Sequence, residues 1–327
     1  MSDDLLHGRQ ASERAKVMGH VAPTAAPEEG CASQSWMRPR ASLPFEVREL
    51  TPAGDLVRPF VNPLHVVGHL WRHRGLIGQL TRRDLASRYR GSFLGMLWSL
   101  LVPLVMLCVY TFVFSVVFRA RWGLGEEGRA LFALILFAGL VPFNIFSEVV
   151  SAAPGLMVGN PNYVKRVVFP LELLPLVKFL GALFHGFISA GVLVLGLLWA
   201  RGTVHPTMAL MPISWMPLLL ITLGGAYFLA ALGVFIRDTT QAVTILLPFL
   251  FFLSPIVYPL EAVPEQYRAI IRFNPISHTV EDARRTAIYG VMPDWVWFAA
   301  LLFVSGLVAL GGFLFFMKSK RAFHDVL

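Results

Sequence analysis

Side chains that could do chemistry are scarce in this chain, and the charged ones inside apolar runs are the most informative. Glu148 lies near the end of one long apolar segment, and Lys178 lies near the start of the next. Ionisable residues within a bilayer are costly, so they indicate function by default. Their positions predict that Glu148 and Lys178 pair across two helices at a similar depth. The alternative interpretation is that each side chain extends separately to the membrane surface.

Two histidines, His185 and His278, are candidates for proton transfer or metal binding. For His185, in the third apolar segment, the interpretations are a proton relay or a packed or pore-facing histidine, because no second ionisable group is obviously placed to continue a relay. His278 has no partner at the spacing of a zinc site. The chain has no Gly-Lys dipeptide, which excludes a Walker A phosphate loop. We therefore expect no catalytic residue, metal site or cofactor in this chain.

These side chains are set in a strongly apolar sequence. Of its 327 residues, 56% are hydrophobic and 15% are charged, whereas about 25% of a soluble domain is charged. Apolar segments that are long enough to cross a bilayer as helices are expected at 94–118, 130–153, 173–200, 213–236, 239–260 and 295–317. The sequence therefore predicts an all-α integral membrane protein with six transmembrane helices.

Basic residues orient these spans. Four arginines stand directly before the first apolar run: Arg82, Arg83, Arg88 and Arg90. Such residues stay in the cytoplasm, and the first span usually decides the orientation. We therefore expect both termini to be cytoplasmic. The formal charge of +8 gathers at membrane edges and not in a nucleic-acid-binding motif, so no nucleic-acid partner is expected.

The chain divides into three regions by composition. Residues 1–60 mix Ala, Pro, Ser and charges of both signs without a period, which predicts a disordered cytoplasmic tail. Residues 61–92 place apolar residues at roughly helical spacing among Arg, His and Gln, which indicates an amphipathic helix in the inner membrane interface. Residues 93–327 are expected to form the six-span domain.

Two loops are longer than a simple connection requires. Residues 261–290 read as two short amphipathic helices separated at Asn274-Pro275, which predicts a helical hairpin on the outer side between spans five and six. The inner loop at 154–170, PGLMVGNPNYVKRVVFP, holds a short basic amphipathic piece between prolines. It can be interpreted as a docking element for a soluble partner or as a helix on the membrane surface.

A dense aromatic run follows in LPFLFFLSPIVYPL. Its members are Phe249, Phe251, Phe252 and Tyr258. Aromatic faces stack on the apolar faces of sugar rings, so these residues are candidates to line a glycan path. The alternative is that they face lipid or the membrane interface, as most aromatic residues of membrane proteins do.

Several ordered motifs make the chain resemble a known family. The stretches are RRDLASRYRGSFLGMLWSLLVPL, NPNYVKRVVFPLELLPL, GVFIRDTTQAVTILLPFLFFLSPIVYP and NPISHTVEDARRTAIYG, with AFHDVL at the end. They are similar to the membrane subunit of ABC-2 type polysaccharide exporters, which handle O-antigen, capsule and teichoic acid polymers. The resemblance implies a permease, not itself an enzyme, that moves a lipid-linked polysaccharide across the bacterial inner membrane. The alternative is an ABC-2 exporter of a lipid or a drug-like small molecule.

The resemblance also implies partners and sites. The partners are a second copy of the chain, a separate subunit that binds ATP and Mg, an undecaprenyl-linked glycan and membrane lipids. The implied ATPase-coupling element comprises Asn160, Pro161, Asn162, Tyr163, Lys165 and Arg166. The implied cytoplasmic entrance comprises Arg83, Asp84, Arg88, Tyr89, Arg90 and Gly91. Residues 261–290 match the outer gate helices, and no fixed chemistry is expected at His185.

Overall fold

The computed structural model describes residues 62–113, 128–164 and 169–326, all within one unit of the chain, Thr51–Leu327. The predicted tail at 1–60 lies outside the described residues, as do Lys165 and Arg166 of the implied coupling element. No strand occurs in the described ranges. Their helices are α1 Pro63–Arg72, α2 Arg74–Arg88, α3 Trp98–Tyr110, α4 Gly128–Ala152, α5 Pro161–Val164, α6 Leu173–Arg201, α7 Met211–Ser214, α8 Met216–Phe235, α9 Thr239–Leu253, α10 Glu265–Phe273, α11 Pro275–Arg284, α12 Trp295–Ser319 and α13 Phe323–Val326.

Five stretches of the described chain are long and apolar enough to span a membrane. They are Gly95–Val113, Leu131–Gly155, Leu173–Arg201, Pro206–Phe235 and Trp295–Ala322. The remaining predicted span, 239–260, is helical only as far as Leu253. Ser254 has extended backbone angles because the ring of the following Pro255 disfavours helical geometry in the residue before it. The 15 residues of α9 are shorter than the roughly 20 that a bilayer core requires.

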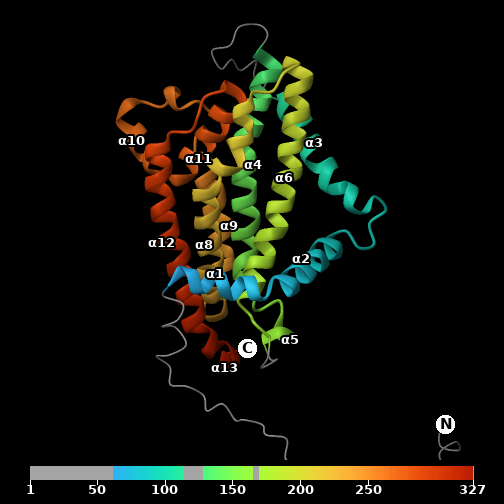
Figure 1. Ribbon diagram of the computed structural model, residues 1–327, viewed down its shortest axis with the longest axis vertical. Coiled ribbons are helices and arrows are strands. Elements are labelled where there is room, and N and C mark those ends of the chain that lie inside the picture. The colour runs from blue at the N-terminus through green and yellow to red at the C-terminus, as the bar shows by residue number, and fades with distance from the viewer. Residues whose placement is uncertain (1–61, 114–127, 165–168, 327) are drawn as a thin grey trace, which may run out of the picture. The chain divides into compact units, whose positions relative to one another are not determined.

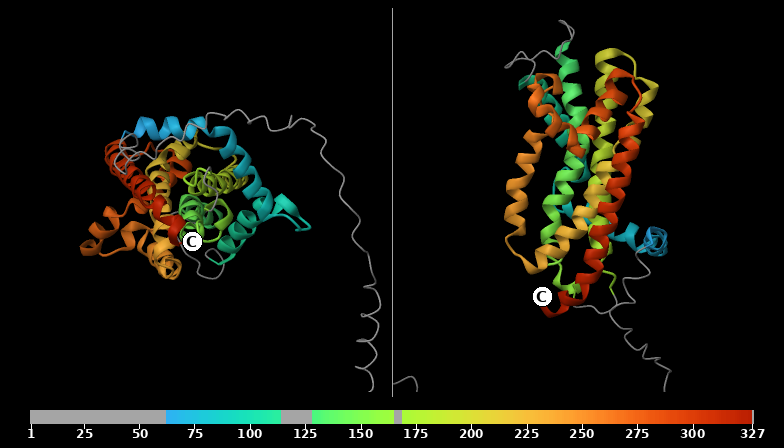
Figure 2. Two further views of the ribbon diagram at one scale, coloured as in Figure 1. Left: turned by 90° about the horizontal axis from the view of Figure 1, so that it is seen from below. Right: turned by 90° about the vertical axis from the view of Figure 1, so that its left-hand side faces the viewer.

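The long helices form a bundle with α4 near its middle and α3 at its edge (Figures 1 and 2). In the apolar part of the α4 stretch 83% is buried, whereas in the apolar part of the α3 stretch only 11% is buried. Helices α8 and α12 come into close contact at two glycines. A Cβ atom on Gly312 would lie 2.1 Å from the carbonyl oxygen of Gly224, so only glycine lets these backbones touch.

The short helices lie at opposite ends of the bundle. Helices α1 and α2 cross one end beside α5 and α13, whereas α10 and α11 lie at the other (Figure 1). The side chain of Asn62 caps α1 by accepting from the Leu64 amide, with Pro63 at the first helical position. We call the first of these ends the α2 end and the second the α11 end.

Candidate functional site

The site is built where α2 stops and the chain turns into α3. Tyr89 follows the last residue of α2, and Gly91 has a φ of 85° and Gly95 a φ of 50°. Both values lie in the left-handed region that glycine tolerates best. The turn therefore depends on glycine, and it holds the end of α2 against the bundle.

A first carboxylate, Asp84, ties α2 to α6. Asp84 and Arg88 lie four residues apart on one face of α2, and Arg88 Nε is 3.4 Å from Asp84 Oδ2. Lys178 Nζ of α6 lies 3.1 Å from Asp84 Oδ1. A Cβ atom on Gly181 would lie 3.4 Å from Asp84 Oδ2, so the carboxylate packs directly against α6 at this position.

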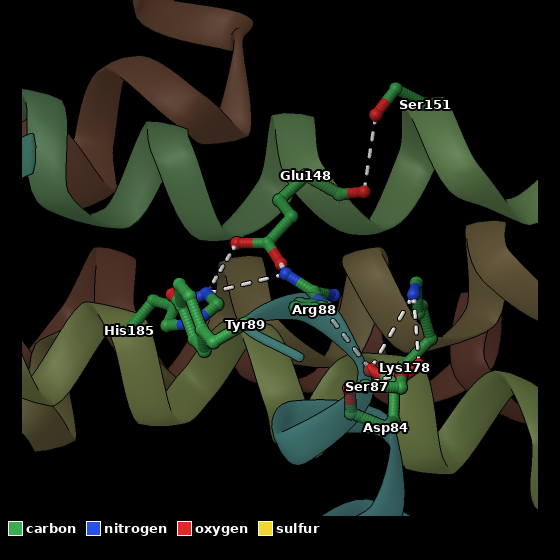
Figure 3. Close-up of polar contacts among 8 residues, drawn as sticks. All are labelled: Asp84, Ser87, Arg88, Tyr89, Glu148, Ser151, Lys178 and His185. Carbon is green, nitrogen blue, oxygen red and sulfur yellow. Dashed lines mark hydrogen bonds and ion pairs between the residues drawn. The ribbon is translucent and has the colours of Figure 1, made fainter. Parts of the chain in front are cut away.

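A second carboxylate, Glu148 of α4, lies at the centre of the same network (Figure 3). The guanidinium of Arg88 donates to Glu148 Oε1. His185 Nδ1 of α6 lies 3.1 Å from Glu148 Oε2, and the hydroxyl of Tyr89 lies 3.1 Å from His185 Nε2. We call the six connected side chains the α2 network: Asp84, Arg88, Tyr89, Glu148, Lys178 and His185.

The α2 network is balanced in charge when His185 is neutral. Asp84 and Glu148 supply two negative charges, and Arg88 and Lys178 supply two positive ones. Burial lowers the pKa of Arg88, but the hydrogen bond and charge of Glu148 outweigh it, and the pKa is raised. Arg88 therefore stays charged, and removing one member of the network would leave its partners uncompensated in a poorly solvated place.

The predicted direct pair of Glu148 and Lys178 is wrong. Glu148 pairs with Arg88 and Lys178 pairs with Asp84. The contact between Arg88 and Asp84 on α2 links the two pairs. Sequence reasoning also found no partner for His185, which the structure places against Glu148, Tyr89 and Arg88. The i, i+4 pair of Asp84 and Arg88 beside Tyr89 was the available signal, because it puts three polar groups at one end of α2.

Two cavities flank the α2 network. One, of about 420 Å³, is lined by polar groups such as Tyr89, Asn144 and His185 and by Val102 and Met106 of α3. The other, of about 540 Å³, lies between α2 and the α5 region. The implied entrance and coupling residues thus border neighbouring spaces at the α2 end.

The α5 segment touches α2 directly. Arg83 donates to the hydroxyl of Tyr163 at 3.3 Å, and the Tyr163 ring stacks on Phe169 with centroids 4.5 Å apart. Asn160 begins the segment, and its side chain donates to the Leu156 carbonyl at 2.9 Å. Asn160, Pro161, Asn162 and Tyr163 all line the larger cavity.

Sequence reasoning missed a buried carboxylate at the start of α6. Glu172 is 2% exposed. Its oxygens lie 2.9 Å from His69 Nε2 of α1 and 2.6 Å from Lys320 Nζ, which follows α12, and Tyr227 donates to its carbonyl. Burial raises the pKa of Glu172, but the charge and hydrogen bond of Lys320, together with hydrogen bonds from the backbone and His69, outweigh burial, and the pKa is lowered. This carboxylate therefore joins α1, α6 and the end of α12.

The aromatic run does not surround one space within the single chain. Phe249 and Phe252 are exposed, whereas Phe251 packs against Phe143 of α4 with ring centroids 5.3 Å apart. Tyr258 donates to the Phe252 carbonyl at 2.9 Å. Phe251 thus holds α9 to the core, and a glycan path along the other three stays a prediction. Within the described ranges, no cluster of three His, Cys, Asp or Glu side chains could hold a metal ion.

The comparisons with known proteins define the class. Residues 75–288 match the family described as ABC-2 type transporter. The chain therefore belongs to the ABC-2 type transporter family, and it is a multi-pass membrane protein. The resemblance found in the sequence is confirmed.

Three relatives carry more particular names. The chain is 33% identical over 205 residues to the O-antigen export system permease protein RfbA of Myxococcus xanthus. These residues cover 62% of this chain and 75% of the relative. It is 26% identical over 255 residues to an RfbA protein of Klebsiella pneumoniae, with coverages of 77% and 95%. It is 25% identical over 219 residues to the polysialic acid transport protein KpsM of Escherichia coli, with coverages of 65% and 81%.

Proposed function

We propose that this chain is the permease subunit of an ATP-driven exporter that moves a lipid-linked polysaccharide across the bacterial inner membrane. The observation that carries the proposal is the similarity to proteins named for O-antigen export and polysialic acid transport. The lipid carrier is proposed to be undecaprenyl. ATP and Mg would bind a separate subunit, since this chain has no Walker A loop.

The working unit is proposed to be a homodimer of permeases with two ATP-binding subunits. The α2 end would face the cytoplasm, because the arginines before α3 belong on that side, and both termini would lie there. Helix α9 and the residues after it would form a short fifth crossing, so that the chain would cross the membrane six times. The α10–α11 segment would then form the hairpin at the outer face.

The proposed coupling runs through α5. The ATP-binding subunit would contact Asn160–Tyr163 together with Lys165 and Arg166. The hydrogen bond between Arg83 and Tyr163 would pass a movement of α5 to α2. Asp84 and Arg88 connect α2 to α6 and α4, so the same movement would reach two spans. ATP binding can drive transport only if it favours one arrangement of this connection over another.

The smaller cavity at the α2 end supports a cytoplasmic entrance. Its mixed lining of polar groups and apolar α3 side chains suits an amphiphile, and the polar head of the lipid carrier would lie near Tyr89 and His185 with its hydrocarbon along Met106. Arg83, Arg90 and Gly91 would form the approach. A site of a few hundred Å³ with a few placed polar groups is typical of ligand binding.

The test is deletion of the gene in its host, followed by fractionation of lipid-linked glycan across the inner membrane. We expect the polymer to accumulate on the cytoplasmic side and surface glycan to be lost, with both restored by the wild-type gene. Deletion of the ATP-binding partner should trap the same polymer. Normal surface glycan, in a host without a functional paralogue, would instead favour the lipid or drug exporter.

A further inference from the structure

A cavity lined by both polar and apolar side chains lies at the α11 end, far along the chain from the α2 network. It has a volume of about 310 Å³ and lies between α10, α11 and the start of α12. Its polar lining includes Arg272, Ser277, His278, Asp282, Arg285 and Trp297. Four of these residues recur at helical spacing along α11 and the turn that follows it, so they share one face.

The walls of this cavity are held in place by groups that do not line it. Buried Arg284 donates to the carbonyls of Ile135 in α4, at 3.1 Å, and of Pro255, at 2.6 Å. Asn274 caps α11 and also donates to Ser254 Oγ at 2.9 Å. The backbone of α11 is therefore fixed against the bundle on this side.

Two polar atoms at this cavity lack partners. Ser277 is 5% exposed, and its hydroxyl has no hydrogen-bond partner within the described part of the protein. The same holds for Nε2 of His278, whose ring stacks on Trp297 with centroids 5.1 Å apart. Buried polar groups nearly always find a partner. Both atoms are covered by their neighbours, so a ligand with hydroxyl groups would supply both partners once the two side chains turn into the cavity.

The charges around the cavity narrow the ligand class. Asp282 and Glu281 are acceptors, and Glu281 Oε2 also lies 3.9 Å from Arg284 Nη1. Arg272 and Arg285 are donors, and the charge of Arg285 acts on Asp282. The two carboxylates would repel an anion, and the two guanidinium groups would repel a cation. A neutral polyol pairs with both kinds of group, and a sugar ring can also lie against the indole of Trp297.

A second cavity, of about 410 Å³, continues the first. It is bordered by Glu265, Arg268 and Phe273, and it shares Arg272 and Trp297 with its neighbour. Two adjoining cavities, each with an apolar and aromatic lining and a few charged groups, suit consecutive units of a chain better than one isolated small molecule. We propose that the α10–α11–α12 cavities bind neutral sugar units of a glycan, with Ser277, Asp282, Arg272 and Trp297 as the recognising groups. This inference rests on the proposed function, since it assumes that a glycan reaches the α11 end.

The first experiment measures binding to the full chain purified in detergent. The probe is polysaccharide freed from its lipid and taken from the host surface, and dextran and inorganic phosphate serve as comparison ligands. We expect saturable binding of the host glycan that Ser277→Ala and Arg272→Gln each weaken about tenfold, as the loss of a charged or buried hydrogen bond implies. Arg237→Gln, exposed and at the α2 end, is the matched control and should bind as the wild type does.

Two outcomes would overturn the proposal. One is equal glycan binding by the wild type and both variants while their unfolding temperatures also agree. The other is competition by inorganic phosphate, which would indicate an anion site. Failure of the proposed function is read separately, from the gene deletion. If deletion traps glycan but Ser277→Ala and Trp297→Phe export normally, export stands and the sugar site does not.

Discussion

Arg88, the last residue of α2, donates to the carboxylate of Glu148 near the end of α4. The contact makes a helix that crosses the end of the bundle part of the same polar network as two spans. Glu148 also contacts His185, and Arg88 contacts Asp84. A change at either residue is therefore felt by both α4 and α6.

The first prediction concerns which charge pair is coupled. Glu148→Gln should lower the free energy of unfolding by about 1–3 kcal/mol, because Arg88 and His185 lose a charged partner in a partly solvated place. A double-mutant cycle should give a large coupling energy for Glu148 with Arg88 and a small one for Glu148 with Lys178. The measurement is unfolding of the purified protein in detergent. Equal coupling for both pairs would contradict the arrangement of the network.

The second prediction tests the link between α5 and α2. Tyr163→Phe keeps the ring stack on Phe169 but removes the hydroxyl that accepts from Arg83. We expect surface glycan to fall several-fold while the protein level and binding of the ATP-binding subunit stay unchanged. Tyr267→Phe, an exposed residue of α10, is the control. Loss of ATP-binding subunit from purified complexes would instead assign Tyr163 to docking.

Much of the bundle follows from hydrophobicity, and the parts that do not have local causes. Five predicted spans are helices of membrane length because their apolar runs have no other way to satisfy the backbone in lipid. The predicted fifth span is short because Pro255 ends α9. A proline at this position in the sequence already indicates a helix end. Asn274-Pro275 did separate two short helices, α10 and α11.

The partners within the site were beyond reach of one sequence. Arg88 and Glu148 lie 60 positions apart, and pairing them requires the rotation of α4 and the path of α2 to be known. Depth along two neighbouring spans was readable, which is why Glu148 and Lys178 were matched to each other. Glu172 and Arg284 were missed because each lies beside a helix boundary in the sequence, where charges are usually solvated.

The third prediction follows from the lowered pKa of Glu172. An acid whose pKa is lower in the folded protein adds stability above its unfolded pKa of 4.5, and this stability is lost as pH falls through the folded value. At pH 7, Glu172→Gln should therefore unfold more readily than the wild type. The difference should shrink as the pH drops below about 4.5. A thermal unfolding series from pH 7 to about pH 2 checks this, and a difference that grows towards acid would refute it.

The fourth prediction has the opposite sign. Burial raises the pKa of Asp282 from 3.8 to about 6. Stability from the protonated form is thus full below pH 3.8 and is lost as pH rises to about 6. Asp282→Asn should then be more stable than the wild type at pH 7, by at most about 3 kcal/mol, and equally stable in acid. It should also bind the host glycan more weakly, which separates the fold from the sugar site.

The fifth prediction uses glycines on one helix. Gly312→Ala would press a methyl group into the Gly224 backbone, 2.1 Å from its carbonyl oxygen. We expect a loss of about 2 kcal/mol or more in the free energy of unfolding, because neither backbone can yield. A Cβ on Gly311 or Gly306 would meet nothing within 4 Å, so Ala there should be neutral within about 0.5 kcal/mol or stabilising. Unfolding of the three variants side by side decides the matter, since similar losses at all three would show that α8 and α12 do not meet at Gly312.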